Sequence, residues 1–571
     1  MKDTDPASKA MLIGSGIILG TFIPFTLLLH LALALTGGGS APWNPFLLLL
    51  RVITHEVSVS APAWIIVGCF FTLLVLVVGF VGFKYVRPHR TRKRGDSAAK
   101  HLGGKAASAS VRIKSVQAKA SAFGLDPSKH PGYPLGNAVA DGGCIWGDWE
   151  SVSMVLAGPR TGKTTAFAIP LILASPGSVL ATSNKRDIVD ATLGVREKVG
   201  QVWLFDPCSI RKEEARCYWN PLTYVIDDAH YDGTVVSRAS ELSSILGDAA
   251  RAGNTGSRGY DSFWDGGGDR IRSELIAAAA LGNKSMADVY TWVAQELNRE
   301  PVKILKAARW DQMADSLEAA INLPEETRGG MWACARMGLE WLEDPGFAQW
   351  WQSGGGRQEF SPSDFSQATD QTLYSLSRDA SAVTPLVAAL TAITCKAAEF
   401  TAESRGGRLA TPMMVILDEA ANVCPWRELP KLYSHFGSKG ILLITILQSW
   451  SQGVDVWAET GMMKLWSAAN NAIYAGGMKE VPALENFSKL IGTHYVDQVS
   501  RSTSVGVTTR SVNVESSERP IATIDDLASL PEWRAWLFAT HARPVLLEIL
   551  PWFTGTRKTE IDDSFATYGA H

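Results

Sequence analysis

The sequence predicts an α/β protein with a parallel, doubly wound sheet, an inserted all-helical domain and an N-terminal hairpin of two membrane spans. The first observation is an alternation of strand-length apolar runs with helical windows, which begins near Ser151. In chains with this alternation, helices cover both faces of a mostly parallel sheet. The second observation is an interruption at residues 227–352, where helical windows replace strand signals. The third is a pair of long uncharged runs near the N-terminus.

The two uncharged runs span residues 11–35 and 64–83 and contain no Asp, Glu, Lys or Arg. Because about 20 helical residues cross the hydrocarbon core, each run predicts a transmembrane helix. Six Lys and Arg residues lie between Lys84 and Arg94, and such clusters face the cytoplasm. We therefore expect a multi-pass protein of the inner or plasma membrane, with its N-terminus and large C-terminal part in the cytoplasm. A signal peptide in place of the first span is the alternative, although the run is longer than usual for one.

Composition restricts the classes of ligand. The net charge of −3 gives no overall argument for nucleic acid, so any contact with DNA has to be local. The stretch from Lys84 to Lys119 contains eleven basic residues and one acid, Asp96. We interpret it as a juxtamembrane linker attracted to anionic lipid, and a DNA-contacting segment is the alternative. The seven cysteines lack metal-ligand spacing, which predicts reduced thiols and no zinc site.

Residues 151–165, SVSMVLAGPRTGKTT, have the pattern of a strand, a glycine-containing turn, Lys-Thr and the start of a helix. This is the context of a phosphate-binding loop, although Ala157 occupies the usual first glycine position. Lys163 would reach the β- and γ-phosphates of ATP, and the Thr164 hydroxyl would hold Mg²⁺. The residues that we predict to bind the nucleotide are Gly158, Pro159, Arg160, Thr161, Gly162, Lys163, Thr164 and Thr165.

A second polar feature follows the apolar run 413–417, which ends in Asp418-Glu419. An apolar strand that ends in Asp-Glu is typical of a Walker B motif. Asp418 would orient the Mg²⁺ shell, and Glu419 would polarise the attacking water. The run 441–447 ends in Gln448, which would sense the γ-phosphate or hold the lytic water. A solvated strand end is the alternative for Gln448.

These patterns divide the chain into segments. The helical segment is rich in tryptophan, and we expect most of these side chains to pack in the core rather than stack on bases. The segment Val496–Val514 alternates and predicts an exposed hairpin. We predict a transmembrane hairpin at 1–90, a basic linker at 91–130, a nucleotide-binding domain at 131–226 and 353–555, an all-α domain at 227–352 and a loose tail at 556–571.

Together, the membrane runs, GPRTGKT, LDEAAN (Leu417–Asn422) and LQS (Leu447–Ser449) resemble the type IV secretion coupling proteins, the TraG/TraD-like ATPases of conjugation. Smaller matches are TSNK (Thr182–Lys185), FDP (Phe205–Pro207) and WNPL (Trp219–Leu222). The resemblance implies a RecA-like motor that is anchored in the membrane and assembles as a homo-hexamer. It implies that single-stranded DNA with its bound relaxase, or protein effectors, pass to channel components of the secretion system. It also implies that the helical insertion recognises substrate.

The resemblance assigns a role to each motif residue. Lys163 and Thr164 would bind nucleotide and Mg²⁺, with Asp418 on the metal side, Glu419 as the catalytic glutamate and Gln448 as the sensor. The family also uses a basic residue from a neighbouring subunit, located just before the sensor strand. Lys439 is the nearest candidate here, although lysine lacks the bidentate geometry of arginine. The alternatives for this residue are Arg501 and Arg543.

The sequence therefore predicts an ATP hydrolase that pumps DNA at a membrane. A membrane-anchored docking receptor, which uses ATP only for assembly or unloading, is one alternative. An FtsK-like translocase of double-stranded DNA is another, although no separate C-terminal basic domain follows the nucleotide domain.

Overall fold

The computed structural model describes residues 27–35, 42–54, scattered positions between 56 and 72, residue 93, and 95–569 except 254–259, 380 and 504–509. The chain divides into two units, Met1–Arg92 and Lys93–His571. In the first unit, residues 27–35 are helical and Leu33 packs with Leu48 of α2 (Pro45–Ile53). None of the helices within the described residues is long and apolar enough to cross a membrane. Most of both predicted spans lies outside the described residues.

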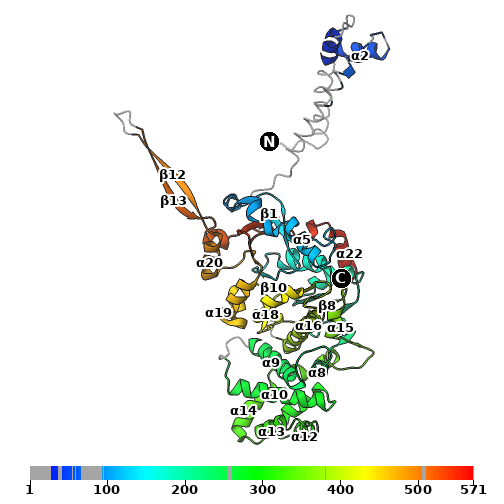
Figure 1. The fold of residues 1–571 in the computed structure, drawn as a ribbon, viewed down its shortest axis with the longest axis vertical. Helices are drawn as coiled ribbons and strands as arrows, with labels where there is room; N and C mark the ends of the chain where they lie inside the picture. Colours follow the sequence, from blue (N-terminus) through cyan, green and yellow to red (C-terminus); the bar gives the residue numbers. More distant parts are fainter. Residues whose placement is uncertain are drawn as a thin grey trace. The chain divides into compact units, whose positions relative to one another are not determined.

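An eleven-stranded sheet organises the second unit, in the order β2-β1-β15-β14-β11-β3-β10-β9-β4-β8-β5. Figure 1 labels β1, β10 and β8 of this sheet. Its strands from β11 to β5 pair in parallel, which confirms the predicted parallel core. These parallel strands are β11 (Asn471–Tyr474), β3 (Ser153–Leu156), β10 (Ile441–Leu447), β9 (Met413–Leu417), β4 (Val179–Ser183), β8 (Thr372–Leu376) and β5 (Val202–Phe205).

Both faces of the parallel core are buried, which explains the continuous apolar runs of its strands. Met154 and Leu156 of β3 face one hydrophobic cluster, whereas Val155 faces the other. Because the strand alternates sides, each cluster takes every second residue. The helices of the α/β body are α6 (Ile169–Ala174), α7 (Asp187–Arg196), α8 (Pro221–Ile226), α15 (Pro362–Gln367), α16 (Thr384–Ser404), α17 (Ala420–Val423), α18 (Leu429–Phe436), α19 (Trp450–Ala468), α20 (Val481–Ile491) and α21 (Ile524–Ala528).

Four antiparallel strands extend the sheet at one edge, so the sheet is mixed rather than parallel throughout. They are β14 (Arg534–Ala539), β15 (Val545–Glu548), β1 (Tyr133–Ala138) and β2 (Cys144–Gly147). In the register, Asn137 of β1 lies opposite Glu548 of β15. Strands from distant parts of the chain therefore complete this edge.

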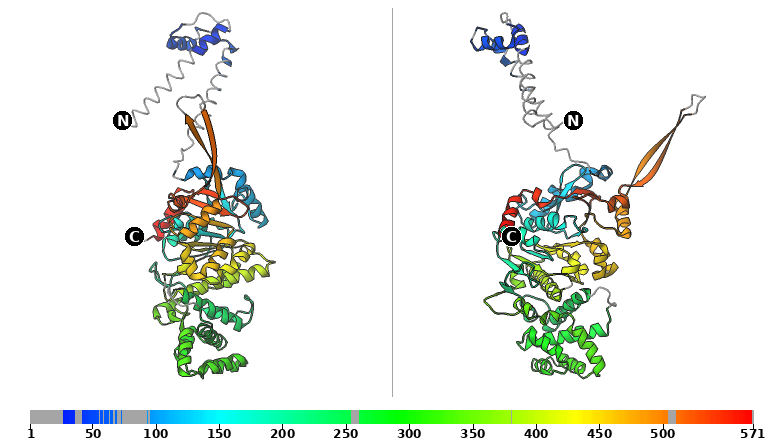
Figure 2. Two further views of the ribbon diagram at one scale, coloured as in Figure 1. Left: turned by 90° about the vertical axis from the view of Figure 1, so that its left-hand side faces the viewer. Right: turned by 180° about the vertical axis from the view of Figure 1, so that it is seen from behind.

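A helical region interrupts the α/β body after β6 (Cys217–Tyr218) and α8, and it ends before β7 (Gln358–Glu359). Figure 2 shows these green helices gathered beyond the sheet in both views. Trp292, Trp332, Trp341, Trp350 and Trp351 are buried there, which confirms that most of these side chains pack in the core. The helices are α9 (Val235–Gly253), α10 (Trp264–Leu281), α11 (Met286–Ala294), α12 (Glu300–Ala307), α13 (Asp311–Ile321) and α14 (Glu325–Arg336).

The basic segment at 91–130 is more than a linker, because its described part folds onto the sheet. It contains α4 (Gly104–Ala107) and α5 (Ile113–Ala122). The Arg534 guanidinium donates to both carboxylate oxygens of Asp96, at 2.8 and 3.0 Å. This nearly buried ion pair gives Asp96, the one acid of the segment, a structural role.

The C-terminal part contains one confirmed prediction and one wrong one. Strands β12 (Thr493–Thr503) and β13 (Arg510–Pro520) form the predicted hairpin. The loose tail at 556–571 is wrong for 558–568, which form α22 (Lys558–Tyr568) against α7. Ser564 Oγ donates to the Asp190 carbonyl at 2.7 Å and accepts from the Gly194 N–H at 3.1 Å. These bonds to α7 are tertiary contacts, which local sequence does not reveal.

Candidate nucleotide-binding site

The glycine-containing loop leaves β3 at the carboxyl edge of the sheet. Gly162 has φ +80°, in the left-handed region that favours glycine. A Cβ at this position would lie 2.5 Å from the Trp533 ring, and a Cβ at Gly158 would lie 2.4 Å from the Gly477 carbonyl oxygen. Residues Thr164–Ala168 then form a π-helical turn that leads into α6. Both glycines are therefore required by close packing, and the backbone turn faces the ends of neighbouring strands.

Lys163 and Glu419 form a buried ion pair across this edge. The Lys163 ammonium donates to Glu419 Oε1 at 2.8 Å. Glu419 has φ +53°, a left-handed conformation that costs a non-glycine residue energy and is often retained at functional sites. Burial raises the pKa of the Glu419 carboxyl, but the hydrogen bond and charge of Lys163 outweigh burial, so the pKa lies below its ordinary value. The glutamate is therefore held ionised.

Asp418 is buried beside the Thr164 hydroxyl. Its Oδ2 accepts from Thr164 Oγ1 at 3.5 Å and from Ser183 Oγ at 3.4 Å. Its Oδ1 is buried and has no hydrogen-bond partner among the described residues. Burial raises the pKa of Asp418 to about 6, although Lys163 acts in the opposite direction. A carboxylate oxygen without a partner beside a hydroxyl is the kind of oxygen donor set that Mg²⁺ takes, so these residues fit the ion.

Gln448 reaches the same carboxylate from the neighbouring strand. Strand β10 lies between β3 and β9, so its end places Gln448 between the loop and the acids. The Gln448 side chain lies beside the Glu419 carboxylate and helps to lower its pKa. The fold therefore brings Lys163, Thr164, Asp418, Glu419 and Gln448 together, and their individual roles stay predictions.

Sequence reasoning missed two polar groups of this site. Asn184 Nδ2 donates to Glu419 Oε2 at 2.8 Å and to Asp379 Oδ1 at 3.1 Å. Lys185, the next residue, lowers the pKa of both Asp418 and Glu419 through its charge. The signal in the sequence was the polar run Thr182–Lys185, and its place beside Glu419 depends on β4 lying next to β9.

Lys439 lies elsewhere in its own chain. It precedes β10, at the opposite end of that strand from Gln448. Its ammonium is 2.5 Å from carboxylate oxygens of both Glu399 and Glu403. Lys439 therefore does not join Lys163 within one chain, and its predicted action on a neighbouring subunit stays a prediction. The structure describes no side chain for Arg501.

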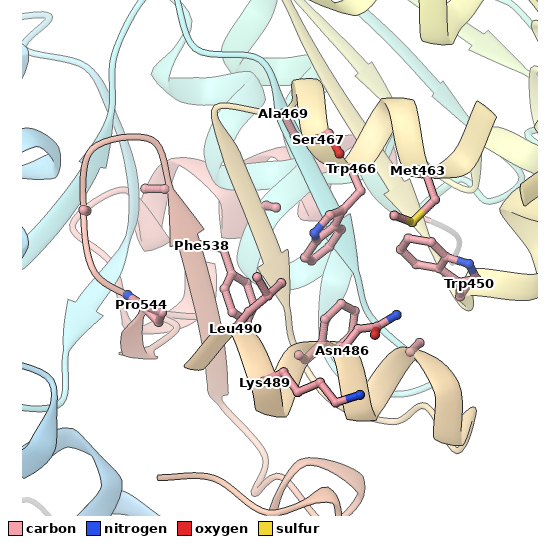
Figure 3. Close-up of a pocket in the computed structure, with 15 residues that line it drawn as sticks. Trp450, Met463, Trp466, Ser467, Ala469, Asn486, Lys489, Leu490, Phe538 and Pro544 are labelled. Atoms are coloured by element: carbon pink, nitrogen blue, oxygen red, sulfur yellow. The ribbon is translucent and has the colours of Figure 1, made fainter. Parts of the chain in front are cut away.

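A separate cavity of about 680 Å³ lies between α19, α20, β11 and β14. In Figure 3 the side chains of Trp466, Phe538 and Leu490 face one another across it, with Lys489 and Asn486 at its margin. The lining is mostly apolar and contains none of the motif residues. We take the strand-end cluster as the candidate site because charged and polar groups converge there.

Comparison with known proteins gives consistent matches. Residues 412–532 match the family model described as the TraM recognition site of TraD and TraG. A probable conjugal transfer protein TraG of Sinorhizobium fredii is 22% identical over 501 residues, which cover 82% of this chain and 74% of the relative. A conjugal transfer protein TraG of Agrobacterium fabrum is 22% identical over 416 residues, which cover 71% of this chain and 60% of the relative.

Two solved structures of coupling proteins have a fold similar to that of this chain. The bacterial conjugative coupling protein TrwBdeltaN70 superposes with a TM-score of 0.52 at 16% identity, covering 70% of this chain and 85% of that one. The plasmid coupling protein TrwB in complex with ADP and Mg²⁺ gives a TM-score of 0.50, 16% identity and the same coverage. Together, these matches support a relationship between this chain and the type IV coupling protein family. This chain has a mixed α/β fold with a large central sheet, and that fold is similar to the fold of TrwB.

Proposed function

We propose that this chain is a membrane-anchored ATP hydrolase that delivers relaxase-bound single-stranded DNA to a type IV secretion channel. The observation that carries the proposal is the convergence of Lys163, Thr164, Asp418, Glu419 and Gln448 at the ends of three neighbouring strands. A phosphate-binding loop alone would support nucleotide binding but not hydrolysis. The ionised glutamate and the glutamine beside it support cleavage.

Each residue has a task that its position supports. The loop N–H groups and Lys163 would bind the phosphates, and the ammonium would leave Glu419 to do so. Thr164 and Asp418 would hold Mg²⁺, which when bound supplies positive charge to the phosphate oxygens. Glu419 would accept a proton from the attacking water, and Gln448 would orient that water. The TrwB complex with ADP and Mg²⁺ supports this choice of ligands by analogy of fold.

The transport role rests on the relatives. Two of them are described as conjugal transfer proteins, which supports a role in conjugal transfer. DNA with a bound relaxase is the cargo that the resemblance of the motifs implies. Because the family model is described as the TraM recognition site of TraD and TraG, we expect a TraM-like partner on residues 412–532. We further propose a homo-hexamer in which a basic residue of a neighbour completes each site.

The decisive test compares Lys163→Ala with the wild-type full-length chain in a detergent-solubilised ATPase assay. We expect turnover to fall about a hundredfold or more, because the phosphate charge loses its cation. Lys431→Ala is the matched control, since Lys431 lies on α18 with a side chain that is 75% exposed. If Lys163→Ala hydrolyses ATP as fast as the wild type does, the proposal is overturned.

Single-stranded DNA separates the motor from a docking receptor. We expect it to raise turnover of the wild-type chain, and the rise to steepen with protein concentration if a neighbour completes the site. Unstimulated turnover together with tight binding of a relaxase would favour the receptor. Preferential stimulation by double-stranded DNA would favour an FtsK-like translocase.

The membrane placement has its own test. The basic cluster between Lys84 and Arg94 supports a cytoplasmic C-terminal part. In intact cells, a membrane-impermeant maleimide should label Gly38→Cys, between the proposed spans, and should not label Lys129→Cys. The reverse pattern of labelling would contradict this topology.

A further inference from the structure

We propose that Asn184 is the positioning residue that fixes the catalytic glutamate, Glu419, when Lys163 is engaged by phosphate. The proposal rests on the proposed hydrolysis. Asn184 follows the last residue of β4, and β4 pairs with β9, which ends immediately before the two acids. Among the polar groups at this edge, the Asn184 amide is a neutral donor that contacts the glutamate directly.

The orientation of the amide follows from its two partners. Asn184 Nδ2 is 2.8 Å from Glu419 Oε2 and 3.1 Å from Asp379 Oδ1. An amide nitrogen carries two hydrogens and can serve both acceptors, whereas its oxygen would face two carboxylates without a proton between them. The nitrogen therefore points at the acids. Asp379, which follows β8, accepts from the same amide nitrogen and helps to hold it in place.

The two oxygens of Glu419 are held by different kinds of group. Oε1 accepts from the Lys163 ammonium and Oε2 accepts from the Asn184 amide, both at 2.8 Å. A loop lysine that pairs with phosphate oxygens has to release Oε1. The amide has no such competing ligand, so Oε2 stays fixed while Oε1 becomes free to accept a proton from water. Asn184 thus preserves the geometry of the base at the step when the restraint from Lys163 is lost.

The same strand end serves both acids, which ties their positions together. Ser183 Oγ donates to Asp418 Oδ2 at 3.4 Å and accepts from the Lys185 backbone N–H at 3.2 Å. Asn184, between these two residues, reaches Glu419. A shift of this strand end would therefore move the supports of the metal-side acid and of the base at once.

The test measures steady-state ATP hydrolysis by the full-length chain with Asn184→Ala, Asn184→Asp and the distant control Asn322→Ala. We expect Asn184→Ala to lower kcat about 10-fold to 100-fold, as loss of an orienting partner does, with KM for ATP nearly unchanged. Asn184→Asp should lower kcat at least as much, because it adds a like charge and removes the donor. Asn322→Ala should match the wild type, since Asn322 is exposed on the helical region.

A double-mutant cycle distinguishes positioning from general damage. In a Glu419→Gln background, Asn184→Ala should cause little further loss of kcat, because both changes act through one group. This inference is overturned if Asn184→Ala has the wild-type kcat, or if the two losses are fully additive. Neither result would contradict the proposed ATP hydrolysis. If ATP turnover does not depend on Lys163, both the proposed function and this inference are overturned. Unchanged binding of a fluorescent ADP analogue would show that the variants are folded.

Discussion

Asp418 at the strand ends and Glu274 in the helical region are both buried carboxyls with one oxygen that has no partner within the described part of the chain. Their surroundings differ. Asp418 has two hydroxyls on its other oxygen and the charges of Lys163 and Lys185 nearby. Glu274 accepts one bond, from Ser316 Oγ at 2.6 Å, and only Arg270 offsets its burial by charge.

Burial by itself does not distinguish a carboxyl of a functional site from a carboxyl that only affects stability. Burial raises both pKa values, to about 6 for Asp418 and about 7 for Glu274, so the shift by itself does not mark function. Asp418 lies among cations and donors from several strands, where a ligand can satisfy its remaining oxygen. Glu274 lies between helices α10 and α13 with a single donor. We therefore expect the first to control chemistry and the second to control stability.

The largest expected effect is on turnover. Asp418→Asn should lower kcat of the full-length chain about a hundredfold or more, because a neutral amide cannot take the place of the metal-side charge. Glu274→Gln, which makes the same chemical change at the other buried carboxyl, should leave kcat near the wild-type value. Equal losses in the two variants would remove the distinction between them.

Two glycines, one in the loop after β3 and one in the helical region, test the same contrast. Gly162→Ala forces a Cβ to within 2.5 Å of the Trp533 ring at φ +80°, so we expect ATP affinity to fall about 10-fold to 100-fold. Gly268→Ala places a Cβ 2.5 Å from the Cys334 side chain, where α10 packs on α14. It should cost about 1–3 kcal/mol of unfolding free energy and leave ATP affinity unchanged. Binding titrations and urea unfolding of both variants check this.

Features that are formed by consecutive residues could be predicted from the local sequence. The run SVSMVLAGPRTGKTT specified β3, the loop and Lys163, and the run 413–417 specified β9 with Asp418 and Glu419 at its end. Each of these combines an apolar strand with polar residues immediately after it, so no knowledge of tertiary structure was required.

Contacts between distant segments could not be predicted from the sequence. The pairing of β1 with β15 and the packing of α22 on α7 each join parts of the chain that share no pattern. Asn184 illustrates the same limit at the site. Its place beside Glu419 depends on β4 lying next to β9, and strand order is a property of the whole sheet.

A third prediction concerns pH and the helical region. Burial raises the pKa of Glu274 from 4.5 to about 7, so the folded state binds its proton more tightly than the unfolded state does. The resulting stabilisation is fully present below pH 4.5 and is lost as pH rises through about 7, a change of up to about 3 kcal/mol. Urea unfolding at pH 5 and pH 8 should show this loss in the wild type and a smaller loss in Glu274→Gln. Equal pH dependence in both proteins would contradict the assignment.

The smallest expected effect is that of Lys439→Ala. The ammonium lies between Glu399 and Glu403 of α16, away from the strand-end site of its own chain. Partly exposed ion pairs of this kind contribute about 1 kcal/mol or less, so we expect a small loss of stability and near-normal turnover, similar to Lys431→Ala. A hundredfold loss of turnover at high protein concentration, with stability retained, would instead identify Lys439 as the residue that completes a neighbour's site. Such a result would also mean that the two glutamates release the ammonium on assembly.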